Sequence, residues 1–249
     1  MGEKPYYTLP RLRKISRQVL EALRFIHSLN LLHCDIKPEN IVIKSYSRCE
    51  VKLIDFGSSC FTSDNLTTYI QSRSYRAPEV IIGHPYDSRI DVWSLGAVIA
   101  ELHAGYVLFQ NDSLPCMLSR ISGILGPYPE HVLANGSETS KYFTLSNVLY
   151  EMKSPGADDE SGDDGDESAQ RDDGDEPEAI CQLIYPKRTS LAARLHLRTT
   201  LERIDDEELL FLDFITATLN LDCTQRVTAA QALGHRWLEI PDDVPLYCM

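Results

Sequence analysis

The residues best suited to chemistry lie in one short stretch, residues 33–40 (H-C-D-I-K-P-E-N), and in Asp55-Phe56-Gly57, which begins fifteen residues after Asn40. Carboxylate and carboxamide oxygens are hard ligands suited to Mg²⁺, which binds few protein groups and keeps several waters. A lysine adds a point charge that suits phosphate, and a carboxylate not needed by the metal could accept a proton from a hydroxyl. This set fits phosphoryl transfer, in which catalysis is mostly positioning and neutralisation of charge.

The hydrophobic pattern predicts that helices position these residues. Apolar side chains at three- and four-residue spacing predict a helix over 9–31, and a nearly continuous apolar stretch predicts a buried central helix over 87–102. Further helices are predicted over 114–125, 205–219 and 228–233, the last of them capped by Thr228. Two short β-branched runs, 41–43 and 51–54, predict a small hairpin between the two reactive segments.

Negative charge is concentrated in one segment. The 249 residues include 37 acidic and 24 basic side chains, a formal net charge of −13. Residues 158–178 hold twelve of the acidic side chains and one arginine, a net −11, which leaves −2 for the rest of the chain. Because residues 156–178 carry no large apolar side chain, they are predicted to be a disordered, solvated insertion between a first part, 1–155, and a closing part, 179–249.

Composition also narrows the partners and the compartment. Nucleic acid is disfavoured because phosphate contacts need a clustered basic surface, and no apolar run approaches the length of a membrane span. The seven cysteines are odd in number, scattered and without a C-x-x-C pair, which predicts reduced thiols in the cytoplasm or nucleus and no zinc site. The first fourteen residues lack the apolar core of a signal peptide.

Five motifs in order resemble those of the eukaryotic protein kinase catalytic domain. Residues 33–40 and 55–57 are similar to its catalytic loop and D-F-G motif. Residues 77–79 match A-P-E, residues 91–96 (D-V-W-S-L-G) match the central-helix signature, and Arg226 stands where the family places the arginine that pairs with the A-P-E glutamate. Chance is a poor explanation for five ordered motifs over nearly 200 residues.

The resemblance implies a role for each residue. Asp35 would be the catalytic base, Lys37 would steady the γ-phosphate of ATP as in Ser/Thr-directed kinases, and Asn40 and Asp55 would hold Mg²⁺. Five residues would serve as scaffold rather than take part in the chemistry, with Glu79 and Arg226 forming a buried ion pair: His33, Phe56, Glu79, Asp91 and Arg226.

Three further segments narrow the subfamily. Cys34 replaces the usual arginine of H-R-D, and it is followed by D-F-G-S-S-C at 55–60 and Y-I-Q-S-R at 69–73. Together they resemble the dual-specificity tyrosine-regulated (DYRK) kinases of the CMGC group, especially a plant-type and protist-type branch. In that family the second tyrosine of a Y-x-Y pair is self-phosphorylated. Tyr69 takes its place, whereas the first tyrosine is Thr67 here, and Arg73 and Arg76 are the nearest cations able to bind a phosphate on Tyr69.

One part of the family pattern is not found before Asp35. The 34 preceding residues contain no G-x-G-x-x-G and no V-A-I-K-like strand. The expected fold is therefore mainly α, the C-terminal helical lobe of the kinase fold with a small hairpin and no N-terminal β-lobe. The expected function is transfer of phosphate from ATP, with Mg²⁺, to Ser/Thr of protein substrates, and a truncated, inert lobe that acts as a binding scaffold is the alternative. Oligomeric state is not predicted.

Overall fold

A computed structural model describes residues 7–64, 69–110, 113–153, 180–197 and 206–241. In these residues the longer helices are α1 (Leu9–Ser28), α3 (Arg89–Ala104), α4 (Leu114–Leu125) and α7 (Asp206–Thr218). The short helices are α2 (Pro78–Ile81), α5 (Glu130–Asn135), α6 (Leu191–Arg194), α8 (Ala229–Leu233) and α9 (Arg236–Glu239). The strands are β1 (Leu31–Leu32), β2 (Ile41–Ser45), β3 (Glu50–Leu53), β4 (Cys60–Phe61), β5 (Leu149–Lys153) and β6 (Ile180–Ile184).

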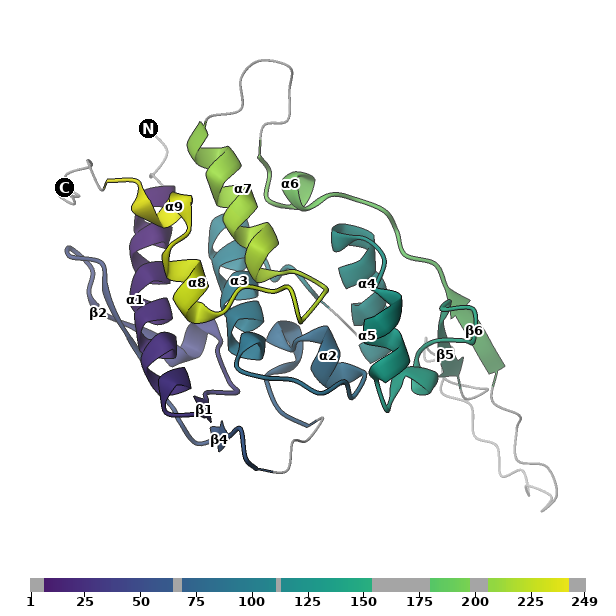
Figure 1. Cartoon of the computed structure of the whole chain (residues 1–249). Helices are drawn as coiled ribbons and strands as arrows, with labels where there is room; N and C mark the ends of the chain where they lie inside the picture. Colours follow the sequence, from purple (N-terminus) through teal and green to yellow (C-terminus); the bar gives the residue numbers. More distant parts are fainter. Residues whose placement is uncertain (1–6, 65–68, 111–112, 154–179, 198–205, 242–249) are drawn as a thin grey trace, which may run out of the picture.

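Helix α3 forms the centre of the molecule. Its residues from Ile90 to Ala100 are all buried, which explains why its sequence is apolar on every side. Helix α1 packs along it on one side, and α7 packs against it as well (Figure 1). Gly96 permits the close approach of α7, because a Cβ at this position would overlap the side chain of Thr218.

The last two described helices pack against the first one. Helices α8 and α9 pack against α1, as the yellow and purple ribbons show (Figure 1). Helix α8 starts with a capping box, in which the Thr228 hydroxyl accepts from the backbone N–H of Gln231 at 3.2 Å. The Gln231 side chain in turn accepts from the backbone N–H of Thr228 at 2.8 Å. Thr228 was predicted as this cap, and the prediction is confirmed.

A second group of elements lies on the other side of α3. Helix α4 contacts β5, β6 and α6, and α5 follows α4 directly in the chain (Figure 1). Strands β5 and β6 pair antiparallel from Leu149↔Ile184 to Lys153↔Ile180. This hairpin was not predicted, because its two strands lie on either side of a long acidic stretch and no tight turn marks their pairing.

The predicted helices are present, with ends that differ by a few residues. The predicted hairpin is also present, with Ile41 opposite Leu53. The prediction of a helical lobe with one small hairpin and no N-terminal β region is wrong. Helix α1 and strands β1 to β4 lie within residues 9–61, and the described residues contain three two-stranded sheets. Strands β1 and β4 have only two residues each, too few for an alternating pattern to reveal them.

Several predictions concern residues outside the described ranges. The acidic segment 156–178, Thr67 and Cys248 all lie there. The division of the chain at residues 155 and 179 therefore stays a prediction. In the described residues, no helix combines the length and the apolar character needed to cross a membrane.

Candidate functional site

The backbone of residues 33–40 is held by a buried carboxylate in the first turn of α3. Asp91, which is fully buried, accepts from the backbone N–H of His33 at 2.8 Å and of Cys34 at 2.9 Å. His27 Nε2 lies 2.9 Å from the same carboxylate. Cys34 has a φ of 64°, a left-handed conformation that costs free energy for a residue with a Cβ. The two bonds to Asp91 offset this cost and fix the direction in which the next residue, Asp35, points.

Asp35 is surrounded by hydrogen-bond donors. Its Oδ1 accepts from the Ser72 hydroxyl at 2.7 Å, and its Oδ2 lies 2.7 Å from Lys37 Nζ. Asn40 Nδ2 donates to Oδ2 at 3.2 Å and to the Asp35 carbonyl at 2.8 Å. Burial acts to raise the pKa of Asp35, but the bonds from Lys37, Ser72 and Asn40 outweigh it and lower the pKa below its usual value. The site therefore presents an ionised carboxylate, a proton acceptor, beside a cation.

Asn40 and Asp55 lie on two segments that the hairpin β2–β3 brings together. Ile54 directly precedes Asp55, and its backbone N–H donates to the Asn40 carbonyl at 2.9 Å. Asp55 is exposed, and its Oδ1 accepts from the backbone N–H of Gly57 at 3.2 Å. Because Nδ2 of Asn40 is bound to Asp35, its Oδ1 is the atom left for a cation.

This donor set of carboxylate and carboxamide oxygens suits a hard cation such as Mg²⁺. In the described ranges no group of three or more His, Cys, Asp or Glu side chains gathers as a metal cluster. Mg²⁺ needs no such cluster, because one or two protein oxygens plus water and substrate phosphates complete its shell. Asn40 and Asp55 offer two such oxygens at the edge of the site.

The side chains of His33 and Phe56 hold the two reactive segments against each other. His33 is fully buried, and its Nε2 lies 3.1 Å from the Ile54 carbonyl. Its ring contacts that of Phe56 with centroids 4.9 Å apart. Both residues touch backbone and ring atoms of the neighbouring segment, which is the supporting role that the resemblance implies.

A cavity of about 760 Å³ opens beside Asp35. Its wall includes Tyr69, Arg73 and Arg76 from the segment that follows the D-F-G motif. The Tyr69 side chain is 88% exposed, and the Arg76 guanidinium lies 5.9 Å from its ring centroid. Arg76 donates to the backbone carbonyls of Ile70 and Gln71, so the position of its guanidinium is fixed. Arg73, by contrast, is exposed. The structure thus brings together Asp35, the predicted acceptor tyrosine and both predicted phosphate ligands.

Two residues of this segment were missed by sequence reasoning. Ser72 links the segment to Asp35, and Lys37 Nζ also lies 3.4 Å from its hydroxyl. Gln71 has a φ of 65°, and its buried amide donates to Ser94 Oγ at 2.8 Å and to the Ile90 carbonyl at 3.0 Å. No local pattern signals either role, because their partners lie 19 to 37 residues away.

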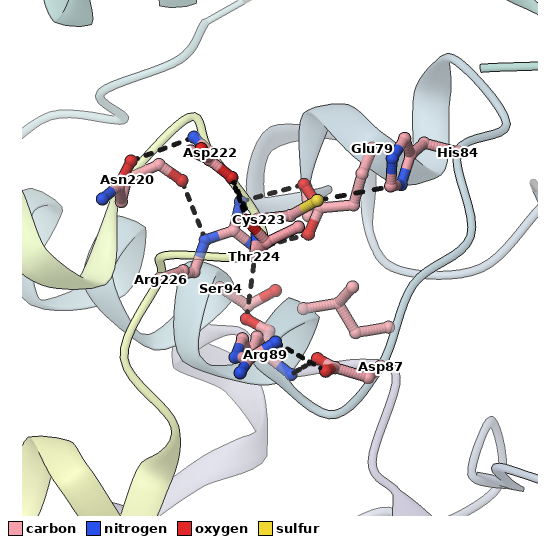
Figure 2. A network of polar contacts seen from close by, with 12 residues as sticks. Glu79, His84, Asp87, Arg89, Ser94, Asn220, Asp222, Cys223, Thr224 and Arg226 are labelled. Atoms are coloured by element: carbon pink, nitrogen blue, oxygen red, sulfur yellow. Dashed lines mark hydrogen bonds and ion pairs between the residues drawn. The ribbon is translucent and has the colours of Figure 1, made fainter. Parts of the chain in front are cut away.

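The glutamate of A-P-E and Arg226 form the ion pair that the resemblance implies. Figure 2 shows the two side chains facing each other, with Arg226 reaching in from the segment after α7. Both are at most 1% exposed, and the contact is bidentate, with Arg226 Nη2 2.9 Å from Glu79 Oε2. Arg226 also donates to the carbonyls of Asn220 and Arg89 and lies over the ring of Trp93. The pair ties α2, which contributes Ile81 to the cavity wall, to the segment that follows α7.

Comparison with known proteins agrees with this geometry. The model of the protein kinase domain family matches residues 2–238. The chain belongs to this family. It is 36% identical over 237 residues to the probable serine/threonine-protein kinase dyrk2 of Dictyostelium discoideum. This match covers 93% of this chain and 22% of that protein. It is 36% identical over 236 residues to dual specificity tyrosine-phosphorylation-regulated kinase 3 of Homo sapiens, covering 93% of this chain and 37% of the relative.

These matches correct one expectation and leave another open. Because the kinase domain model matches almost the whole chain, the expectation that the chain is a single lobe is wrong. The kinase domain is DYRK-like. A fission yeast relative, serine/threonine-protein kinase ppk5, is 33% identical over 238 residues, 95% of this chain and 24% of that protein. Relatives from protists, animals and fungi are thus similarly distant, and the plant-type and protist-type branch stays a prediction. The chain spans between about a fifth and two-fifths of the length of these relatives.

Proposed function

We propose that this kinase domain transfers the γ-phosphate of ATP to serine and threonine hydroxyls of protein substrates. The observation that carries the proposal is the arrangement at Asp35, where an ionised carboxylate lies 2.7 Å from Lys37 Nζ and beside an open cavity. Asp35 accepts the proton of the attacking hydroxyl. Lys37 offsets the negative charge of the transferred phosphoryl group.

A bound Mg²⁺ would neutralise charge on the ATP phosphates. Asn40 Oδ1 and the Asp55 carboxylate are the protein atoms proposed to hold it. Asn40 is buried and fixed by its bonds to Asp35, whereas Asp55 is exposed. This asymmetry predicts that Asn40 also orients the base, and that Asp55 acts on the metal alone.

We also propose that the domain phosphorylates itself on Tyr69. The ring is almost fully exposed and lies on the wall of the same cavity as Asp35. A phosphate there would carry about −1.5 to −2 charges at neutral pH and would meet two guanidinium groups, those of Arg73 and Arg76. Because Arg76 is already fixed by backbone carbonyls, little side-chain entropy is lost on binding.

The test is a phosphorylation assay with radiolabelled ATP and a degenerate serine/threonine peptide library, on the protein and on two variants. Asp35→Asn should abolish transfer at every Mg²⁺ concentration. Asp55→Asn should shift the Mg²⁺ dependence to higher concentration and recover part of the rate. A wild-type protein that binds peptides but transfers no phosphate would favour the alternative, an inert kinase domain that serves as a binding scaffold. Mass spectrometry of the wild-type protein, with Tyr69→Phe as control, tests the tyrosine.

Protein substrates follow from the family, and their identity is not proposed. A cytoplasmic or nuclear location remains a prediction from the cysteine pattern.

A further inference from the structure

A second cavity lies between α4, the end of β6 with the segment that follows it, and α6. It has a volume of about 550 Å³. Four cationic side chains line it and define what we call the basic groove: Arg120, Lys187, Arg188 and Arg194. Among the described residues that line it there is no aspartate or glutamate. None of these described residues also lines the cavity at Asp35.

The charges of the basic groove are not neutralised by the described part of the fold. In the described residues none of the four forms an ion pair, whereas Arg13 and Arg226 each have a carboxylate partner. Arg194 lies with its guanidinium 5.0 Å from the ring centroid of Tyr106, and its Nε is buried without a hydrogen-bond partner. The four positive charges are therefore left to solvent or to an anionic ligand rather than to a carboxylate of the described residues.

The groove is built by a specific close approach. The backbone of Lys187 crosses α4 at Gly123, where an added Cβ would lie 2.5 Å from the Lys187 carbonyl oxygen. The Thr189 N–H donates to the Gly123 carbonyl at 2.9 Å. This contact fixes the segment that carries Lys187 and Arg188 against the helix that carries Arg120. The cations therefore approach the cavity from separate elements that are held in place.

We propose that the basic groove binds a phosphorylated serine or threonine of a protein substrate. Three of the four cations are arginines, whose planar guanidinium binds phosphate oxygens in pairs. One phosphate carries about −1.5 to −2 charges, so a single group can satisfy several convergent cations, whereas carboxylates would have to enter one by one. Ile184 and Tyr185, also in the lining, offer apolar surface for the neighbouring peptide residues. The choice of a phosphorylated protein as ligand rests on the proposed function.

The consequence is a preference for substrates that have already been phosphorylated once. Binding in the groove would raise the local concentration of such a substrate at the separate cavity that holds Asp35. The groove would then select substrates without taking part in phosphate transfer.

The test measures binding by fluorescence anisotropy with a labelled 12-residue peptide library that contains one central phosphoserine. Serine and glutamate versions of the library serve as comparisons. The wild-type protein should bind the phosphoserine library at least ~10-fold more tightly than either comparison. Arg120→Gln with Arg188→Gln should remove most of this difference. Both side chains are exposed, so the variant is expected to fold.

A matched control is Arg24→Gln with Arg236→Gln, which removes the same charge from exposed arginines outside the groove and should leave binding unchanged. Equal losses in the two double variants would overturn the proposal, because they would show only a bulk charge effect. Equal binding of the glutamate library would also overturn it. So would stronger binding of a synthetic peptide of residues 158–178, which would mean that the groove takes acidic sequences. Asp35→Asn should bind the phosphoserine library normally, so a failure of catalysis and a failure of the groove are distinguishable.

Discussion

The region around Asp35 and the region around the basic groove use charge in opposite ways. The charged groups that hold the backbone around Asp35 are buried and partnered, as with Asp91 and with the pair Glu79–Arg226. Around the groove they are mostly exposed and have no carboxylate partner in the described residues. Buried, paired charges fix backbone position, because any displacement would leave a charge without its partner. Exposed, unpaired charges contribute little to the fold and remain available to a ligand.

The largest expected effect is at the base itself. Asp35→Asn keeps the shape but removes the proton acceptor, so kcat should fall by ~10²- to 10⁴-fold. The free energy of unfolding should change far less, because the amide can still bond with Ser72 and Lys37 lies near the surface. Steady-state kinetics and urea unfolding of the same preparation check both parts. A variant that keeps most of its kcat would exclude Asp35 as the base.

Next in size is the buried ion pair. Arg226→Met leaves the Glu79 carboxylate buried and alone, which should cost ~3–5 kcal/mol of unfolding free energy. The double variant Glu79→Leu/Arg226→Met should lose less, since it leaves no buried charge. Unfolding in guanidinium chloride gives the free energy of unfolding of the wild type, the single variant and the double variant. As a control, Lys141→Met removes an exposed partner of Glu138 and should leave the unfolding midpoint unchanged. Equal losses in the single and double variants would show that packing, and not the pairing of charges, stabilises this part.

A smaller effect concerns pH. The pKa of Asp35 is lowered in the folded protein, so its ionised form stabilises the fold above the unfolded-state pKa of about 4. This contribution is lost as the pH falls through the lowered folded-state pKa. The difference in unfolding free energy between wild type and Asp35→Asn should therefore shrink on acidification from pH 6 to pH 3. A difference that grows on acidification would contradict the direction of the shift.

The smallest effect is expected from the acidic segment. Deletion of residues 156–178 should move the melting temperature by only a few degrees, because no large apolar side chain is removed. Calorimetry of the deletion variant measures this. Loss of cooperative unfolding would show that the segment is part of the folded structure and that the region around the basic groove depends on it.

The sequence by itself indicated the candidate reactive residues and determined most of the helices. Asp35, Lys37 and Asn40 lie within six residues of the chain, and Asp55 follows fifteen residues after Asn40, so their types and spacing were enough to indicate phosphoryl transfer. The helices α3 and α4 were predictable because their apolar pattern extends over three turns or more. The same reasoning failed for β1 and β4, which are two residues long, and it gave a description of the fold that the kinase domain match corrected.

Only the tertiary structure decided which distant groups meet. Ser72 lies 37 residues from Asp35, and Gln71 lies 23 residues from Ser94, yet their bonds set the position of the cavity wall. The basic groove likewise joins Arg120 to residues more than sixty positions later, across the contact at Gly123. The local spacing of residues does not predict such pairs, because they form only when packed elements exclude water and bring their side chains to a common surface.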